Sequence, residues 1–142
     1  NFMKKHTTLA LLLLLFYSCS KDGHMVHKII GVWSLDAFYE NDVLMDIPCL
    51  DLISVDFKSN GTHIETTANE IDGVCVENEP QKYYWKHIGD DAFELWSSEN
   101  TSENRGVVTF HFIDDNEFYF EDAYYNYENQ LVSFKRVFKR VE

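Results

Sequence analysis

The chain has 142 residues, which is enough for one domain with a modest hydrophobic core. It carries 24 acidic and 12 basic side chains, giving a formal net charge of −12 at pH 7. A surface of this sign repels nucleic acids, so we expect no nucleic-acid partner. The basic residues gathered near the C-terminus are interpreted as the solvated face of a last strand: Lys135, Arg136, Lys139 and Arg140.

The first segment of the chain has the order of regions found in a secretory signal peptide. Lys4 and Lys5 form a short positive region, and an apolar run follows over residues 9–17. This run is too short for a transmembrane helix, which needs about 20 apolar residues. It also lacks the polar face that a helix at the surface of a soluble domain would have. We therefore expect residues 1–18 to be a signal peptide that is removed.

The stretch "FYSCS" at the end of this segment resembles the lipobox of bacterial lipoproteins, in which a small residue precedes the lipid-bearing cysteine. Ser18 and Phe16 depart from the commonest pattern in the way that lipoproteins of Bacteroidetes do. The resemblance implies cleavage before Cys19, palmitate or similar acyl chains on it, and an outer-membrane location, on the periplasmic face or the cell surface. The alternative is an ordinary signal peptide followed by a chance cysteine. Residues 19–27 would be the lipidated N-terminus and a tether, with room for a short turn of helix, and residues 28–142 the folded domain.

Lipidation of Cys19 would leave Cys49 and Cys75 as an even pair among the three cysteines of the chain. An exported protein enters an oxidising compartment, so we expect these two cysteines to form a disulfide. For the loop that a Cys49–Cys75 disulfide would close, the chain-entropy model gives about 3 to 4 kcal/mol of stabilisation. No CxxC motif occurs, so neither a redox dithiol nor a zinc site is expected.

After the tether, short runs of alternating apolar and polar residues are separated by turn residues. The run "ISVDF" places Ile53, Val55 and Phe57 on one face, and Asn60-Gly61 follows it as a hairpin signal. Further runs of this kind lie at 81–88, 92–97, 106–113, 117–125 and 131–141. They predict an all-β fold, a sandwich or a barrel, and the consecutive hairpins favour an antiparallel up-and-down order.

Gly31 and Trp33 resemble the G-x-W signature that opens the first strand of lipocalins and fatty-acid-binding proteins. The wider pattern, in which a cysteine precedes a strand ending in D-F-x-x-N-G and a second cysteine follows, is similar to the lipocalin-like domains of Bacteroidetes lipoproteins. The resemblance implies a lipocalin-like barrel of about eight strands. It also implies that the tryptophan closes one end of the barrel against a basic side chain of the last strand, for which Arg136 and Arg140 are candidates.

Aromatic residues make up 15% of the chain and alternate along the predicted strands. They either line a cavity for an apolar ligand or fill the barrel, because eight-stranded barrels are just wide enough to be filled by side chains. The alternation by itself favours a packed core. The candidate ligand-binding residues are Tyr83, Trp85, Phe110, Phe112, Phe118, Phe120 and Phe134. The tyrosines of the segment 124–127 would form either an exposed recognition rim or a cap on the barrel.

The sequence contains no recognisable catalytic or metal-binding motif. His63, His87 and His111 lie on separate predicted strands and lack the close spacing of metal ligands. No nucleophile elbow, P-loop or dinucleotide-binding glycine motif occurs. Acidic residues are abundant, but their spacing selects no glycosidase-like pair. We expect no metal, no cofactor and no catalysis.

Together these patterns predict an envelope-anchored lipoprotein that binds or carries a small apolar ligand within a β-barrel. Two alternatives stay open. The first is a filled barrel that acts as a non-catalytic module for binding another envelope protein. The second is a glycan-active enzyme. The expected partners are the membrane, through a lipid on Cys19, a small apolar molecule and, in the first alternative, an envelope protein.

Overall fold

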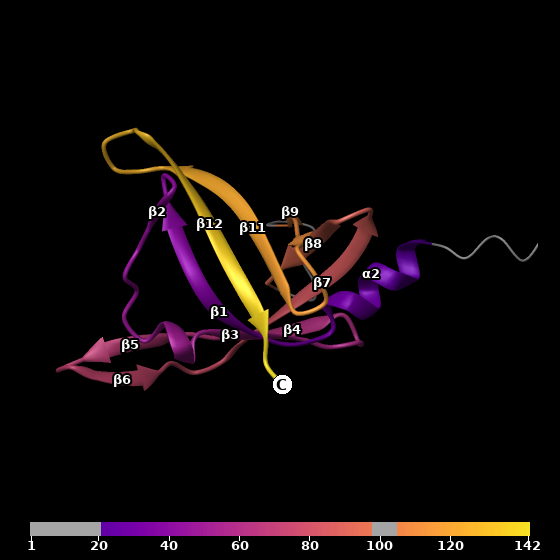
Figure 1. Cartoon of the computed structure of the whole chain (residues 1–142), viewed down its shortest axis with the longest axis horizontal. Coiled ribbons are helices and arrows are strands. Elements are labelled where there is room, and N and C mark those ends of the chain that lie inside the picture. The colour runs from indigo at the N-terminus through magenta and orange to yellow at the C-terminus, as the bar shows by residue number, and fades with distance from the viewer. Residues whose placement is uncertain (1–20, 98–104) are drawn as a thin grey trace, which may run out of the picture.

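The computed structural model describes residues 21–97 and 105–142 (Figure 1). The predicted signal peptide and the predicted lipid-bearing Cys19 lie outside the described residues. In the described part, no helix is long and apolar enough to cross a membrane. The one α-helix of this part, α2 (Lys21–Ile29), overlaps the segment expected to be a tether with a short turn of helix.

Strands make up most of the rest of the described chain. Helix α2 leads into the first of them, and one short 3-10 turn interrupts the series. The elements are β1 (Gly31–Glu40), β2 (Val43–Leu44), η1 (Leu50–Leu52), β3 (Ser54–Phe57), β4 (Thr62–Thr66), β5 (Ala68–Ile71), β6 (Val74–Glu77), β7 (Gln81–Gly89), β8 (Ala92–Trp96), β9 (Gly106–Thr109), β10 (His111–Phe112), β11 (Glu117–Tyr125) and β12 (Leu131–Arg140).

The strands pair antiparallel around a nearly closed barrel. Neighbouring strands follow the order β10-β11-β12-β1-β3-β4-β7-β8-β9, and β2 pairs with β1 beside this path. Only Phe110 separates β9 from β10, so residues 106–112 form one bent strand that pairs first with β8 and then with β11. Counted this way, the ring formed by the described residues has eight strands. The predicted all-β fold and the up-and-down antiparallel barrel are confirmed.

Tight turns at Asn, Asp and Gly residues join consecutive strands. Asn41 and Asp42, between β1 and β2, have φ angles of 48° and 64°, and Asp72 and Gly73, between β5 and β6, have φ angles of 52° and 77°. Two successive residues with positive φ are typical of a type I′ hairpin turn, which these residue types adopt at low cost. Short connections of this kind produce the up-and-down order.

The core consists mainly of aromatic rings inside the barrel. Near its centre, the ring centroid of Phe110 lies 4.9 Å from that of Phe118 and 5.0 Å from that of Phe93. Tilted and edge-on contacts between rings add about 0.5–1.5 kcal/mol to the free energy gained by burying them. The other buried residues of this core are Ile29, Trp33, Leu35, Val55, Phe57, Trp85 and Phe138.

A disulfide joins Cys49, just before η1, to Cys75 in β6, with 5.6 Å between the two Cα atoms. β5 and β6 form a two-stranded sheet of their own, which extends away from the barrel in Figure 1. The disulfide therefore fastens this hairpin to the segment that precedes β3. The predicted Cys49–Cys75 pairing is confirmed.

Candidate ligand-binding cavity

One end of the barrel is covered by Trp33, the last turn of α2 and Arg140. The Trp33 side chain is fully buried, and its Nε1 donates a 2.7 Å hydrogen bond to the carbonyl oxygen of Ile29. The guanidinium carbon of Arg140 lies 4.2 Å from the Trp33 ring centroid. Arg140 also donates hydrogen bonds to the carbonyl oxygens of Lys28 (2.7 Å) and Ile30 (2.9 Å), which holds the end of α2 against the barrel.

Arg140, rather than Arg136, is the basic side chain that lies over the tryptophan, because strand pairing sets Trp33 opposite Arg140. Gly31 makes room for this contact. Its φ of 131° is a conformation that other residues rarely adopt, and a Cβ at this position would lie 2.6 Å from Nη1 of Arg140. Gly31 therefore permits both the unusual backbone conformation and the close approach of Arg140.

A cavity of about 260 Å³ lies inside the barrel above this covered end. Its buried wall includes the rings of Phe57, Phe110, Phe118 and Phe138 and the side chain of Val55. An apolar cavity of roughly 150 Å³ accepts benzene, and drug-sized ligands occupy about 300–1,000 Å³. The space therefore suits a compact molecule. The aromatic residues thus form a packed core near Trp33 and leave a cavity farther along, whereas the alternation by itself favoured a core packed throughout.

Polar side chains gather where the cavity reaches solvent. Arg136 and Asp122, on β12 and β11, are exposed and line the cavity from one wall. Glu65 lines it from β4, next to the buried His63. Arg136 stands four positions before Arg140 on the same strand, about 13 Å away at the usual rise per residue. The polar end of the cavity is therefore the end opposite the Trp33–Arg140 contact.

Arg136 is held by aromatic rings. Its guanidinium carbon lies 5.4 Å from the ring centroid of Phe134 and 5.8 Å from those of Phe38 and Phe120. Contacts of this kind are worth about 0.5–1 kcal/mol at exposed sites. They position a positive charge at the polar end of the cavity.

The structure divides the seven predicted ligand-binding residues into two groups. Phe110, Phe118 and Phe120 line the cavity. The other four do not, and each is engaged elsewhere. Phe112 lies 6.3 Å from Trp33 at the covered end, and Phe134 stacks on Phe38 at 6.1 Å, both measured between ring centroids. The remaining two are Tyr83, whose ring stacks on His63, and Trp85.

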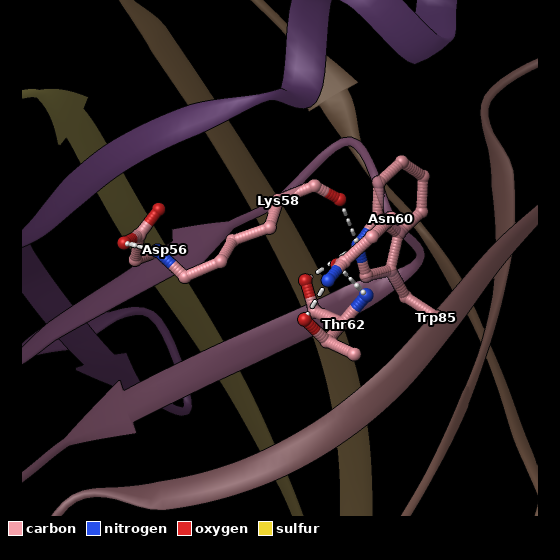
Figure 2. Close-up of polar contacts among 5 residues, drawn as sticks. All are labelled: Asp56, Lys58, Asn60, Thr62 and Trp85. Atoms are coloured by element: carbon pink, nitrogen blue, oxygen red, sulfur yellow. Dashed lines mark hydrogen bonds and ion pairs between the residues drawn. The ribbon is translucent and has the colours of Figure 1, made fainter.

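Trp85 stabilises the turn between β3 and β4 (Figure 2). Its Nε1 donates hydrogen bonds to the carbonyl oxygens of Thr62 (2.9 Å) and Lys58 (3.2 Å). In the same turn, Oδ1 of Asn60 accepts hydrogen bonds from the backbone N–H and the hydroxyl of Thr62. The Asn60-Gly61 turn predicted from the sequence is thus tied to β7 by an indole that does not reach the cavity.

Sequence reasoning missed several lining residues, among them Phe57, His63, Arg136 and Phe138. The signal for Phe57 was present, because Phe57 shares one face of an alternating strand with Val55, which also lines the cavity. His63 continues the inward alternation on β4 with Glu65. A polar residue at a position that the alternation directs into the barrel indicates a residue that lines a cavity.

The three histidines of the separate strands do not come together. Nε2 of His87 lies 2.7 Å from the carbonyl oxygen of Asp90, and the His111 ring stacks on Tyr119. His63 is in the cavity wall. Within residues 24–97 and 105–142, no group of three or more His, Cys, Asp or Glu side chains is placed to hold a metal ion.

No protein-family model matches the sequence, and no curated protein matches it either. Among solved structures, the fold is similar to lobster apocrustacyanin A1, with 13% identity, a TM-score of 0.46, and coverage of 85% of this chain and 69% of that one. It is also similar to a dog lipocalin allergen, with 17% identity, a TM-score of 0.40, and coverage of 79% and 73%. Both scores are too low to establish a family.

Proposed function

We propose that the protein binds a small apolar molecule in the cavity of its barrel. The observation that carries the proposal is the cavity of about 260 Å³ walled by buried aromatic rings. An apolar molecule in this cavity would gain dispersion contacts with the aromatic walls and would leave water, and both effects favour binding. The binding is non-catalytic in this proposal.

The volume limits the size of the occupant. A cavity somewhat larger than the roughly 150 Å³ that accepts benzene suits one or two fused rings or a short aliphatic chain. The polar groups at the open end, Arg136, Asp122 and Glu65, lie where a substituent on such a molecule would meet water.

We further propose that Cys19 carries the lipid that anchors the protein to the outer membrane. The order of regions in residues 1–18 and the lipobox resemblance support this. Helix α2 begins at Lys21, close to Cys19 in the sequence, and packs at the covered end of the barrel. An anchor there would turn the covered end toward the membrane and leave the polar end of the cavity facing away. Intact mass of the protein from membranes, with or without acyl groups at Cys19, tests the anchor.

The binding proposal is tested by filling the cavity. In a Val55→Phe variant, a phenyl ring should occupy space next to Phe57 and Phe110, and binding of a neutral two-ring fluorophore such as 1-naphthylamine should weaken at least about tenfold, or 1.4 kcal/mol. Val32→Phe is the matched control, because Val32 lies on β1 and is 39% exposed. If the dye binds the native protein and both variants equally, or binds none of them, the proposal of a binding site inside the barrel loses its support.

A second candidate function, binding to another envelope protein, is favoured by an apolar rim. Five side chains there are at least 60% exposed: Val43, Leu44, Tyr125, Tyr127 and Leu131. They belong to the β1–β2 and β11–β12 hairpins, which lie at the same end of the barrel in Figure 1. The backbone N–H of Asn41, between β1 and β2, donates a 2.9 Å hydrogen bond to the carbonyl oxygen of Ser133 on β12. Exposed apolar patches often mark protein contacts. A photo-crosslinking residue at Tyr127 should trap a discrete partner in cells, while the same residue at Ile88 should not.

A further inference from the structure

The β5–β6 hairpin is the one sheet of the described chain that stands apart from the barrel. β5 and β6 pair with each other, and no other strand of the described residues pairs with either of them. In Figure 1 the hairpin extends to the lower left, away from the β11–β12 hairpin at the top. None of its residues lines the cavity, and none belongs to the apolar rim. The hairpin is therefore a separate surface of the molecule.

Strand register divides this hairpin into two faces of different character. Residues directly opposite each other in an antiparallel pair share a face. Ile71 pairs with Val74, and Asn69 pairs with Val76, so these four side chains lie on one face. Its three aliphatic side chains are exposed, Ile71 by 56%, Val74 by 61% and Val76 by 44%. This face is therefore mainly apolar and largely open to solvent.

The opposite face is acidic, and the hairpin is fastened to the molecule through it. Glu70 pairs with Cys75, and Ala68 pairs with Glu77. The disulfide from Cys75 to Cys49 leaves from this face. Glu70 and Glu77 are exposed, and neither has an ion-pair partner among the described residues. The apolar face is therefore the one turned away from the attachment.

The outer edges of the hairpin offer backbone groups for a further strand. Each strand of a two-stranded sheet directs part of its N–H and C=O groups outward, and such an edge is a template for pairing with another chain. No other strand of the described chain occupies these edges. An isolated hairpin is marginally stable in water, but the Cys49–Cys75 disulfide holds this one to the barrel. An incoming strand would meet a preformed edge, so binding would require little ordering of the hairpin.

The charge of the hairpin disfavours a second copy of the chain as the incoming strand. The segment from Ser59 to Gln81 contains five acidic residues and no lysine or arginine. Pairing of two such hairpins would bring their carboxylates together, and like charges opposite each other in a sheet are destabilising. Charged side chains on edge strands protect many proteins from self-association in this way. The same carboxylates attract a strand that carries basic side chains.

We propose that an edge of the β5–β6 hairpin binds an extended segment of a partner protein in which apolar and basic side chains alternate. A strand added to a sheet directs successive side chains to opposite faces. Its apolar side chains would extend the face formed by Ile71, Val74 and Val76. Its lysines or arginines would lie beside Glu70 and Glu77. Backbone hydrogen bonds supply the affinity and the alternation supplies the specificity, independently of any ligand in the cavity.

The test titrates the full chain with two labelled peptides of the same composition and blocked ends, followed by fluorescence anisotropy. One peptide alternates lysine and valine, and the other carries its lysines in one block and its valines in another. We expect the alternating peptide to bind at least about tenfold more tightly at physiological salt. Equal affinities would mean that net charge alone drives binding, and they would overturn the inference. Failure of the alternating peptide to bind would overturn it as well.

One pair of double variants tests the apolar face. Val74→Thr with Val76→Thr keeps β-branched residues but replaces two exposed methyl groups by hydroxyls, so the preference for the alternating peptide should fall at least about fivefold. Val32→Thr with Ile88→Thr is the matched control, because Val32 and Ile88 are 39% and 44% exposed on strands of the barrel. The control should keep the preference. A preference that survives in the hairpin variant, or that falls equally in the control, would refute the assigned face.

A second pair tests the acidic face. Glu70→Gln with Glu77→Gln should weaken binding of the alternating peptide at least about threefold. Glu128→Gln with Glu142→Gln removes the same charge from exposed positions outside the hairpin and should change the affinity little. Equal weakening by the two pairs would mean that the overall negative charge attracts the peptide, and the inference would fail.

Two measurements on the unmodified protein stand even if a variant does not fold. In ¹⁵N NMR spectra, the alternating peptide should shift the backbone amide resonances of β5 and β6 and slow the solvent exchange of amides on one outer edge. Changes centred on another exposed edge, such as β2, would overturn the inference. Sedimentation of the chain alone should show no association through the hairpin. A dimer that the Val74→Thr, Val76→Thr variant abolishes would make a second copy the occupant and would also overturn it.

Discussion

Replacing Gly31 by alanine should destabilise the barrel through two separable effects. The φ of 131° is strained for any residue with a Cβ, which costs about 1–3 kcal/mol. The new Cβ would also meet Nη1 of Arg140 at 2.6 Å, so the guanidinium must leave its position over Trp33. Losing charge-assisted hydrogen bonds to the carbonyl oxygens of Lys28 and Ile30 adds about 2 kcal/mol. We expect a total loss of about 3–5 kcal/mol in the free energy of unfolding.

Gly89→Ala is the matched control, because Gly89 has a φ of 130° and nothing within 4 Å of an added Cβ. It should show the backbone strain alone, about 1–3 kcal/mol. The assay is urea unfolding followed by tryptophan fluorescence, with midpoints compared at unchanged slope. In an Arg140→Met background, Gly31→Ala should cost no more than Gly89→Ala. Equal losses for both glycine variants in the native background, or full additivity with Arg140→Met, would refute the steric explanation.

Three further predictions concern other parts of the molecule. Replacing Cys49 and Cys75 together by serine should lower the free energy of unfolding by about 3 to 4 kcal/mol, measured in urea, and a loss below about 1 kcal/mol would contradict the loop-entropy estimate. Trp85→Phe keeps the ring but removes the indole donor from the β3–β4 turn, so unfolding should cost about 1–3 kcal/mol less while dye binding is retained. The hydrogen bond from Lys139 to Asp36 and the attraction between their charges raise the pKa of Lys139 above its ordinary value. Stability from this pair is therefore complete below the ordinary lysine pKa and is lost as pH rises through the raised one. Asp36→Asn should lower the pKa that NMR titration gives for Lys139 toward its ordinary value, and an unchanged titration would contradict this.

Much of the barrel could be predicted because its strands bury one face. Strict alternation marks β3, with Val55 and Phe57 directed inward, and turn residues mark the connections. The β5–β6 hairpin was not predicted, because every residue of β6 is exposed and no apolar periodicity marks it. The Asp72-Gly73 pair was the available signal.

The candidate site was predictable in part. Arg136 and Arg140 lie an even number of residues apart, so both point to the same side of β12 and periodicity cannot choose between them. The pairing of Trp33 with Arg140 decides which of the two arginines covers the tryptophan. The register of β1 against β12 that produces this pairing depends on the whole sheet. Whether aromatic rings fill a barrel or leave a cavity depends on many side-chain rotamers at once, and the sequence does not encode these locally.

The bent strand at Phe110 gives the barrel a seam. β10 joins β11 through the pairs His111 with Tyr119 and Phe112 with Phe118, whereas β11 pairs with β12 along its whole length. A boundary held by so short a ladder opens at a lower free energy than the rest of the sheet. Amide protons of β9 and β10 should therefore exchange with solvent before those of β1, β11 and β12. The barrel would then open locally at the boundary between β10 and β11, next to the ring of Phe110 in the cavity wall, and not uniformly around its circumference.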